Sequence, residues 1–305
     1  MTDCVFVARE SDPSESRVSA SPDTVKKLTA TGFDVVVEAG AGLNSRIPDA
    51  DFEKAGARIG TAAEAGGADV VLRVRRPTGA EMAGYKSGAI VIAIMDPYGN
   101  EAAVADMAKA GLTAFAMELM PRITRAQSMD VLSSQANLAG YQAVIDAAAE
   151  YDRALPMMMT AAGTVPAAKV FVMGAGVAGL QAIATARRLG AVVSATDVRP
   201  AAKEQVASLG AKFIAVEDEE FKAAETAGGY AKEMSKAYQA KQAELVASHI
   251  AKQDIVITTA LIPGRQAPRL VTREMLAAMR PGSIAVDLAV ERGGNVEGAI
   301  AGEIV

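Results

Sequence analysis

The chain has 305 residues and a formal net charge of -5, so it lacks the basic excess that binding to a nucleic acid backbone requires, and no nucleic acid partner is expected. Its single cysteine, Cys4, permits neither an internal disulfide nor a cysteine metal site, and no metal is expected. No apolar run approaches the roughly 18 residues of a membrane span, and the N-terminus lacks a signal-peptide pattern, so we expect a cytoplasmic chain that does not insert into a membrane.

Short Val- and Ile-rich runs alternate with helical patterns over the first half of the chain. Strands are expected at residues 4–8, 34–40, 69–74, 89–95 and 113–119. Such alternation predicts a parallel sheet with crossover helices. A helix is expected to begin after Ser21, which can cap free backbone amides, with Pro22 at a position where its missing N–H does no harm. We therefore assign residues 1–133 to an N-terminal α/β domain.

A long helix is expected over about residues 134–154, where Gly140 is the only glycine and no proline occurs. The apolar positions spaced for one face are Leu138, Tyr141, Val144, Ile145 and Ala148. This pattern predicts a helix that joins two domains. A proline-bounded connection follows at residues 156–168.

The second half repeats the alternation. Strands are expected at residues 169–173, 191–197, 211–216, 254–260 and 282–290. A long polar segment at residues 217–252 interrupts them, and long insertions of this kind are often functional lids. The predicted fold is therefore α/β, with two doubly wound parallel-sheet domains joined by a long helix, the second being a Rossmann domain over residues 134–305.

A glycine-rich turn follows the first strand of this second domain. Gly174, Gly176 and Gly179 have GxGxxG spacing, in which the first glycine permits a tight turn, the second lets the backbone approach a pyrophosphate, and the third packs helix on strand. The phosphates would lie at the helix N-terminus. The spacing predicts a dinucleotide site, with a doubly wound domain that binds no nucleotide as the alternative.

Asp197 closes the next strand, where a carboxylate can accept hydrogen bonds from the adenosine ribose hydroxyls of NAD. A 2'-phosphate would meet like charge there, so NAD is favoured over NADP. Arg199 keeps NADP open as an alternative, because an arginine can bind a 2'-phosphate.

The segment at residues 121–135 gathers polar side chains before the long helix. Any one of them can be read as a loop or capping residue. Together, at a junction of two domains where clefts form, they include side chains suited to a carboxamide and a ribose.

Five motifs occur along the chain: "MELMPRITRAQSMDVLSSQANLAGY", "VFVMGAGVAGLQAIATARRLGA", "ETAGGYAKEM", "TTALIPGRQAP" and "VDLAVERGGN". They resemble the NAD(H)-binding component, domain I of the alpha subunit, of proton-translocating nicotinamide nucleotide transhydrogenases, a family related to alanine dehydrogenase. The similarity covers essentially the whole chain. It implies an oxidoreductase of the Si-specific type that passes hydride between its own NAD(H) and NADP(H) on a partner domain, with a membrane domain coupling the reaction to proton movement.

The resemblance also implies site residues. Gln127, Arg122 and Asp130 match the family's catalytic loop, and Ser133 accompanies them in orienting the nicotinamide carboxamide and ribose. The family's mobile loop matches "AGGYAKEM". It supplies Gly229, Tyr230 and Met234 as a lid over the nucleotide. The remaining expected nucleotide contacts are Gly174, Gly176, Val177, Gly179, Asp197, Val198, Arg199, Ala260 and Leu261.

Amino-acid dehydrogenation is a different chemistry, because it moves a proton and needs a positioned acid or base, whereas transfer between two nicotinamides moves only hydride. The only histidine, His249, is expected on a helix, exposed or half-buried. Related alanine dehydrogenases carry a histidine where this chain has "DPYGN", and a substrate lysine where it has Arg73, although Arg17 matches a family arginine. An alanine dehydrogenase-like enzyme and a non-catalytic NAD(H)-binding subunit remain as alternatives.

The resemblance implies partners as well. We expect membrane-spanning and NADP-binding transhydrogenase subunits, a homodimer, and a location at the inner membrane through those subunits. Family members continue past "VDLAVERGGN", so the second domain is expected to be truncated at its C-terminal end.

Overall fold

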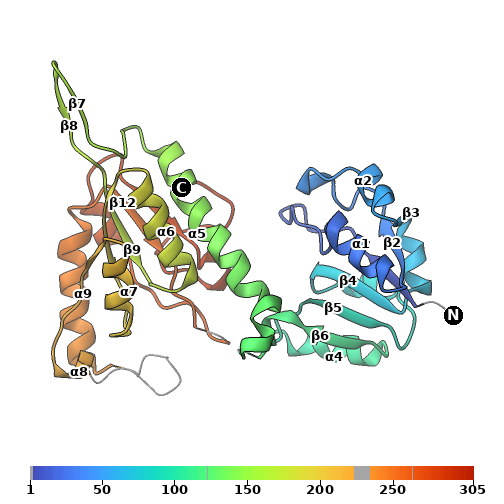
Figure 1. Ribbon diagram of the computed structural model, residues 1–305. Helices are drawn as coiled ribbons and strands as arrows, with labels where there is room; N and C mark the ends of the chain where they lie inside the picture. Colours follow the sequence, from blue (N-terminus) through green and yellow to red (C-terminus); the bar gives the residue numbers. More distant parts are fainter. Residues whose placement is uncertain (1–2, 122, 223–233, 263) are drawn as a thin grey trace. The chain divides into compact units, whose positions relative to one another are not determined.

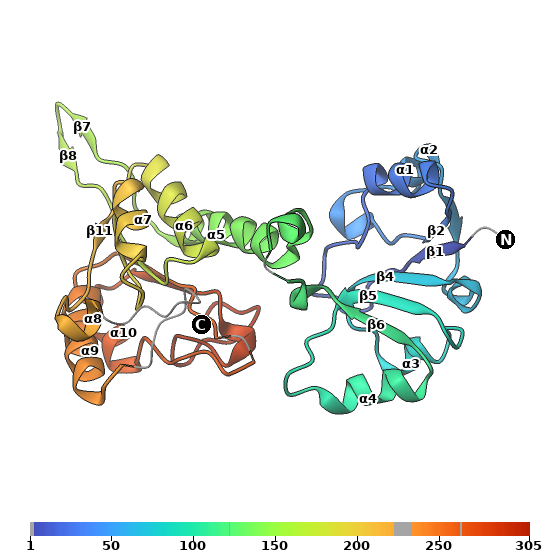
Figure 2. The same ribbon diagram turned by 60° about the horizontal axis from the view of Figure 1, so that its bottom comes forward.

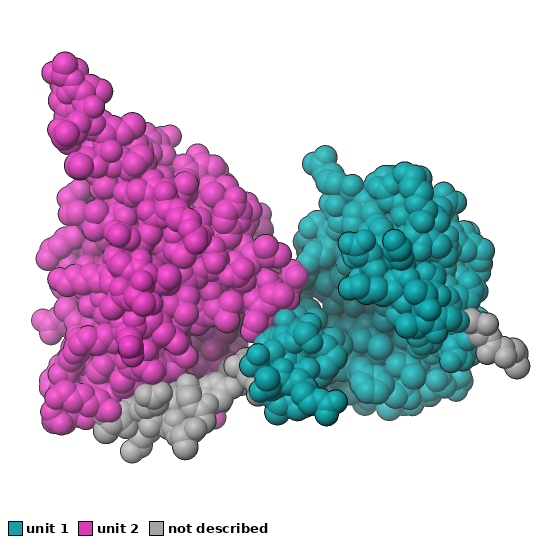
Figure 3. All heavy atoms as spheres, in the orientation of Figure 1, with its two compact units in different colours: residues 1–131 teal, residues 132–305 magenta. Residues whose placement is uncertain are grey.

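A computed structural model describes residues 3–121, 123–222, 234–262 and 264–305 of the chain. The chain divides into two compact units, unit 1 (Met1–Val131) and unit 2 (Leu132–Val305), coloured separately in Figure 3. Each unit is an α/β body with a parallel sheet, as the sequence predicted. The boundary expected after Ser133 stays a prediction.

Unit 1 has a six-stranded parallel sheet in the order β3-β2-β1-β4-β5-β6. Its strands are β1 (Cys4–Val7), β2 (Asp34–Glu38), β3 (Arg58–Gly60), β4 (Val70–Arg75), β5 (Ile90–Ile94) and β6 (Thr113–Ala116). Its α-helices are α1 (Pro22–Ala30), α2 (Asp49–Lys54), α3 (Gly79–Met82) and α4 (Glu101–Lys109). The order reverses between β1 and β4, which is the switch point of a doubly wound sheet.

Helices cover both faces of this sheet, with α1 and α2 on one side and α3 and α4 on the other (Figure 2). One core contains Val25 of α1 and Phe52 of α2, and the other contains Met82 of α3 and Met107 of α4. The helix start after Ser21 is confirmed, because the Ser21 hydroxyl accepts from the Thr24 amide and Pro22 occupies the first helical position.

Unit 2 begins with the long helix α5 and has a five-stranded parallel sheet in the order β11-β10-β9-β12-β13. Its strands are β9 (Lys169–Met173), β10 (Val192–Thr196), β11 (Lys212–Phe213), β12 (Ile255–Thr258) and β13 (Ile284–Asp287). Its α-helices are α5 (Val131–Glu150), α6 (Val177–Arg188), α7 (Ala202–Ser208), α8 (Glu219–Lys222), α9 (Lys236–Ile250) and α10 (Arg273–Ala277). The sheet order reverses between β9 and β12, at the end of the strand that leads into the glycine turn.

The expected connection at residues 156–168 is in fact a hairpin. It consists of β7 (Met158–Thr160) and β8 (Gly163–Val165), paired antiparallel, and it projects from unit 2 (Figure 1). All six of its strand residues are exposed.

The predicted buried face of α5 was wrong. Leu138 and Tyr141 are 59% and 47% exposed, and the buried positions are Gly140, Ala143, Val144 and Ala147. A Cβ on Gly140 would lie 2.0 Å from the carbonyl oxygen of Ala178, so the backbones of α5 and α6 are in close approach there. Small residues are buried because only they allow this approach.

Among the residues that the structure describes, none of the helices combines the length and the apolar character that crossing a membrane requires.

Candidate nucleotide site of unit 2

The turn between β9 and α6 gives each glycine of the fingerprint a separate physical role. Gly174 has φ +107°, a backbone conformation that side chains rarely adopt, and a Cβ there would lie 2.5 Å from the Thr259 hydroxyl. A Cβ on Gly179 would lie 1.7 Å from the carbonyl oxygen of Gly174. A Cβ on Gly176, by contrast, would meet nothing within 4 Å. The chain itself therefore requires Gly174 and Gly179, whereas Gly176 leaves space above the turn.

This space lies at the N-terminus of α6. Gly176 is the N-cap, no side chain caps the helix, and its first turn has no acidic residue. The first amides of a helix have no partner within the helix, and together with the helix dipole they favour an anion. The turn is therefore suited to the pyrophosphate of a dinucleotide.

Asp197 directly follows β10, and its side chain is only 8% exposed. Its carboxylate accepts from the Ala175 amide at 2.7 Å, so the predicted ribose acid also holds the glycine turn. It further accepts from the Arg199 amide at 2.8 Å and from the Arg199 guanidinium at 2.9 and 3.0 Å. A ribose hydroxyl would find a carboxylate acceptor already oriented by these groups.

The loop after β12 lies against the same turn. The Thr259 hydroxyl donates to the carbonyl oxygen of Gly174 at 3.1 Å, which holds the two loops together. Asn295 is fully buried and binds both backbone groups of Ala260, accepting from its amide at 3.0 Å and donating to its carbonyl oxygen at 2.9 Å. A further hydrogen bond joins Asn295 to the carbonyl oxygen of Pro268 at 2.8 Å.

Sequence reasoning gave Asn295 no role, although it ends the motif "VDLAVERGGN". The signal for it is the preceding glycine pair, Gly293 and Gly294, both at positive φ (+94° and +77°). Such a turn aims the asparagine into the protein interior rather than into solvent.

The structure brings most of the predicted contacts together along the turn, the end of β10 and the loop after β12. Val177, Val198 and Leu261 are exposed there, as side chains free to cover a planar ligand would be. Ser133 lies near the start of α5. Their contact with a nucleotide stays a prediction.

The remaining expected residues lie elsewhere. Gln127 and Asp130 belong to unit 1, in and directly after the 3-10 helix Thr124–Met129, so their place at the nucleotide stays a prediction. Arg122, Gly229 and Tyr230 lie outside the described residues. Met234 is buried in a cluster with Phe221 and Tyr238, and its role in a lid is likewise untested.

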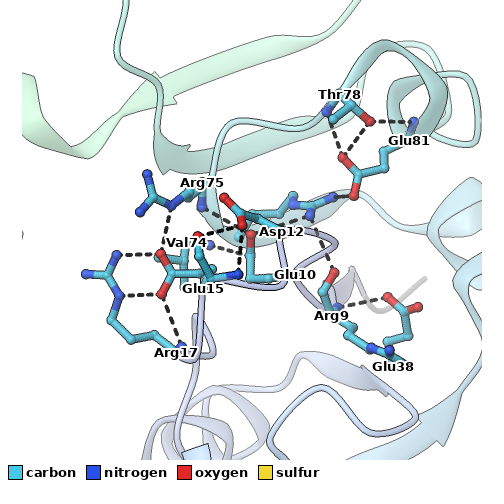
Figure 4. Close-up of polar contacts among 12 residues, drawn as sticks. Arg9, Glu10, Asp12, Glu15, Arg17, Glu38, Val74, Arg75, Thr78 and Glu81 are labelled. Atoms are coloured by element: carbon cyan, nitrogen blue, oxygen red, sulfur yellow. Dashed lines mark hydrogen bonds and ion pairs between the residues drawn. The ribbon is translucent and has the colours of Figure 1, made fainter. Parts of the chain in front are cut away.

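Unit 1 holds the two arginines that a comparison with amino-acid dehydrogenases singled out. Arg17 is paired with the buried Glu15 at 2.7 Å (Figure 4). Arg73 is buried between Glu81 at 2.7 Å and Glu10 at 3.5 Å. Burial lowers the pKa of Arg73, but Tyr85 and these carboxylates outweigh burial and raise it. Both arginines are thus bound by carboxylates of the chain itself.

His249 is half-buried on α9 of unit 2, as expected of a helix residue. Its ring lies 2.8 Å from the Ser194 hydroxyl and edge-on to Phe171. Burial, with a smaller contribution from nearby lysines, lowers its pKa. These contacts are with strands β9 and β10, which accounts for the histidine as a packing residue.

Fold and site together define a two-domain α/β protein whose second domain has a Rossmann-like dinucleotide fold. The chain belongs to the alanine dehydrogenase/PNT family: residues 6–139 match "Alanine dehydrogenase/PNT, N-terminal domain" and residues 143–304 match "Alanine dehydrogenase/PNT, C-terminal domain".

Relatives from both branches of this family resemble the chain. It is 58% identical to an NAD(P) transhydrogenase subunit alpha of Rhodospirillum rubrum, over 99% of the chain and 80% of that relative. The crystal structure of transhydrogenase from Sinorhizobium meliloti superposes with a TM-score of 0.91 at 76% identity, covering 99% of this chain and 83% of that one. Alanine dehydrogenase of Mycobacterium tuberculosis is 32% identical over 97% of the chain and 74% of that relative. Similarity is therefore much higher to the transhydrogenase branch.

Proposed function

We propose that this chain is the NAD(H)-binding subunit of a proton-translocating transhydrogenase. The observation that carries the proposal is the open space above Gly176 at an uncapped helix N-terminus, beside the buried carboxylate of Asp197. The high identity to relatives named NAD(P) transhydrogenase subunit alpha supports the same function.

Each element of the site has one task in this function. The amides at the start of α6 bind the pyrophosphate, and Asp197 accepts hydrogen bonds from the adenosine ribose. Gln127, Arg122, Asp130 and Ser133 orient the nicotinamide and its ribose. When bound, the reduced nicotinamide supplies a hydride, leaving NAD+ on this chain and converting NADP+ on the partner to NADPH. The chain's own residues hold the ring in position and exclude water, since no proton changes hands.

The partners belong to this proposal. The NADP(H)-binding domain and the proton-conducting membrane domain are supplied by other subunits, which hold this chain at the inner membrane. A homodimer is proposed as well, supported by the exposed apolar side chains of Met158, Met159 and Val165 on the projecting hairpin. Sedimentation of the wild type and of a Met159→Asp variant tests the dimer, which the substitution should weaken.

Replacing Gly176 with alanine tests the nucleotide site directly. The added methyl meets no atom of the chain, and φ of -77° suits alanine, so thermal unfolding should be unchanged. A pyrophosphate on the turn would meet the methyl, so the Kd for NADH should rise at least about tenfold, which corresponds to about 1.4 kcal/mol. NADH fluorescence titration measures the affinity.

Gly67→Ala is the matched control. Gly67 also has open space around its Cβ position and no positive φ, but it lies in unit 1, so its substitution should change neither stability nor affinity. Wild-type protein that fails to bind NADH, or a Gly176→Ala variant with undiminished affinity, would refute the proposed site.

Two assays separate the proposal from its alternatives. Hydride transfer from NADH to an NADP analogue, with an NADP-binding partner present, is expected of a transhydrogenase subunit. NAD-dependent turnover with alanine, or with pyruvate and ammonium, would instead identify an amino-acid dehydrogenase. NADH affinity without stimulated transfer would identify a non-catalytic subunit.

A further inference from the structure

Arg199 is folded back onto the carboxylate that the proposed function assigns to the ribose. Its Nε donates to one oxygen of Asp197 at 2.9 Å and its Nη2 to the other at 3.0 Å, so the pairing is bidentate. Nη2 also donates to the carbonyl oxygen of Ala175 at 3.1 Å. The arginine side chain is 32% exposed, whereas the aspartate side chain is 8% exposed.

This geometry puts a guanidinium within one hydrogen-bond length of the oxygens that would hold the ribose 2'-hydroxyl. A phosphate attached at that hydroxyl would therefore lie beside Arg199. An arginine in this position accommodates the 2'-phosphate in NADP-binding Rossmann domains, and a bidentate guanidinium fits phosphate as well as it fits carboxylate.

The charges work against such a phosphate as the site stands. The positive charge of Arg199 is compensated by Asp197, so the pair is neutral overall. A 2'-phosphate would have to displace the carboxylate from the guanidinium and would then lie against a buried negative charge. NAD, whose hydroxyl donates to the carboxylate, meets neither cost.

We propose that Arg199 is a latent 2'-phosphate ligand and that Asp197 alone withholds it, so the selectivity of this chain for NAD over NADP resides in one ion pair. The inference rests on the proposed function, because it assumes that the adenosine half binds at Asp197. It assigns Arg199 a role as specificity determinant that the glycine turn and the ribose acid do not require.

Such a device matters for transfer between two nicotinamide pools. The reaction has a net effect only if the two domains hold different nucleotides. A chain that also bound NADPH would exchange hydride between identical nucleotides and block its own site.

The test is a set of variants titrated with NADH, NADPH, 5'-AMP and adenosine 2',5'-bisphosphate. In Asp197→Asn, the Kd values for NADPH and for the bisphosphate should each fall at least about tenfold, the size of one charge-assisted hydrogen bond, while the Kd for NADH rises. In the double variant Asp197→Asn with Arg199→Gln, the gain should disappear. The two nucleoside phosphates report the adenosine half alone, independently of the nicotinamide end.

Glu244→Gln is the matched control, because it also removes one carboxylate charge from unit 2, from an exposed position on α9. It should leave the NADPH affinity unchanged, which separates the local pair from the net charge. Asp197→Ser, which keeps a hydroxyl acceptor for the Ala175 amide, provides a second neutral variant should the asparagine destabilise the turn.

The outcomes are distinct from those that test the proposed function. Wild-type protein without affinity for NADH or 5'-AMP would overturn both. NADH binding by the wild type, with no NADPH gain in either neutral variant, would overturn only the inference, as would a gain that survives in the double variant. A gain that depends on Arg199 supports it.

Discussion

Glu15 of unit 1 forms a buried ion pair whose loss should be measurable. Its side chain is 4% exposed, and its carboxylate accepts from Nε and Nη2 of Arg17, both at 2.7 Å, and from Nε of Arg75 at 2.8 Å (Figure 4). Glu15→Gln keeps the shape but removes the charge, and one of its two oxygens becomes a donor facing donors. We expect the free energy of unfolding of unit 1 to fall.

The magnitude follows from the proton affinity of the carboxyl group. Burial alone would raise the pKa of Glu15, but the hydrogen bonds and charge of Arg17, together with Arg75, lower it from 4.5 to about 2. Because a tenfold change in affinity is worth about 1.4 kcal/mol, the upper value is about 3 kcal/mol. Arg17 and Arg75 are 38% and 41% exposed, and solvent screening reduces the expected loss to about 2 kcal/mol.

The sign of the pH dependence is fixed by the lowered pKa. The unfolded chain binds a proton at Glu15 more readily than the folded chain does, so the contribution is complete above about pH 4.5 and is lost as the pH falls toward 2. Glutamine does not titrate. The stability difference between wild type and variant should therefore shrink in acid.

Urea unfolding followed by far-ultraviolet circular dichroism, at about pH 7 and about pH 3, measures this difference. Asp106→Asn is the control, since it breaks an exposed pair with Lys109 on α4 of the same unit and should leave stability nearly unchanged. A Glu15→Gln variant as stable as wild type at neutral pH, or a loss equally large in acid, would contradict the reasoning.

Three further predictions concern unit 2, each read from urea unfolding. Gly140→Ala should lower the free energy of unfolding by about 1–3 kcal/mol, because its methyl would lie 2.0 Å from the carbonyl oxygen of Ala178; unchanged stability would mean that α5 and α6 are not in such close approach. The pKa of His249 is lowered by burial and by nearby lysines, so the folded chain should lose stability as the pH falls below about 6.5, and His249→Gln should lack this dependence. Asn295→Ala leaves both backbone groups of Ala260 without their partner, so it should cost about 2–3 kcal/mol and weaken NADH binding; a stable variant with normal affinity would show that the buried amide does not position the loop.

Most of the fold followed from the sequence because its signals are local. Each expected strand is a run of Val, Ile or Ala long enough to be buried on both faces, and such runs separated by helical patterns form parallel sheets. Strand β3, residues Arg58–Gly60, was not predicted, since three residues give no period. The hairpin β7–β8 was read as a connection because its apolar run is broken by glycine and bounded by prolines.

The long helix shows where a periodic pattern misleads. Its large apolar residues share a helical face with the right spacing, yet Leu138 and Tyr141 are exposed. Burial was decided by the contact with α6, which excludes any side chain at Gly140. A sequence reports the size of its own residues but not the distance to a neighbouring helix, so this choice of face could not be read in advance.

The site was predictable to the extent that it is built from backbone conformation. Gly174 and Gly179 carry constraints that the spacing of the fingerprint already implies. The pairing of Arg199 with Asp197 was not foreseen, because two neighbouring residues can equally well point apart. Asn295 was missed because its partner Ala260 is 35 residues away and a buried asparagine has no sequence signature.

The contacts that hold the described site together are backbone groups fixed by uncharged side chains, with one ion pair at the ribose end. Asn295 fixes Ala260, Thr259 fixes Gly174, and Asp197 fixes Ala175, so the loop after β12, the glycine turn and the end of β10 are connected in one series of hydrogen bonds. A site for proton transfer would have to keep a titrating group mobile and accessible. A site for hydride transfer has to hold a nucleotide without movement, and a rigid framework of this kind meets that requirement.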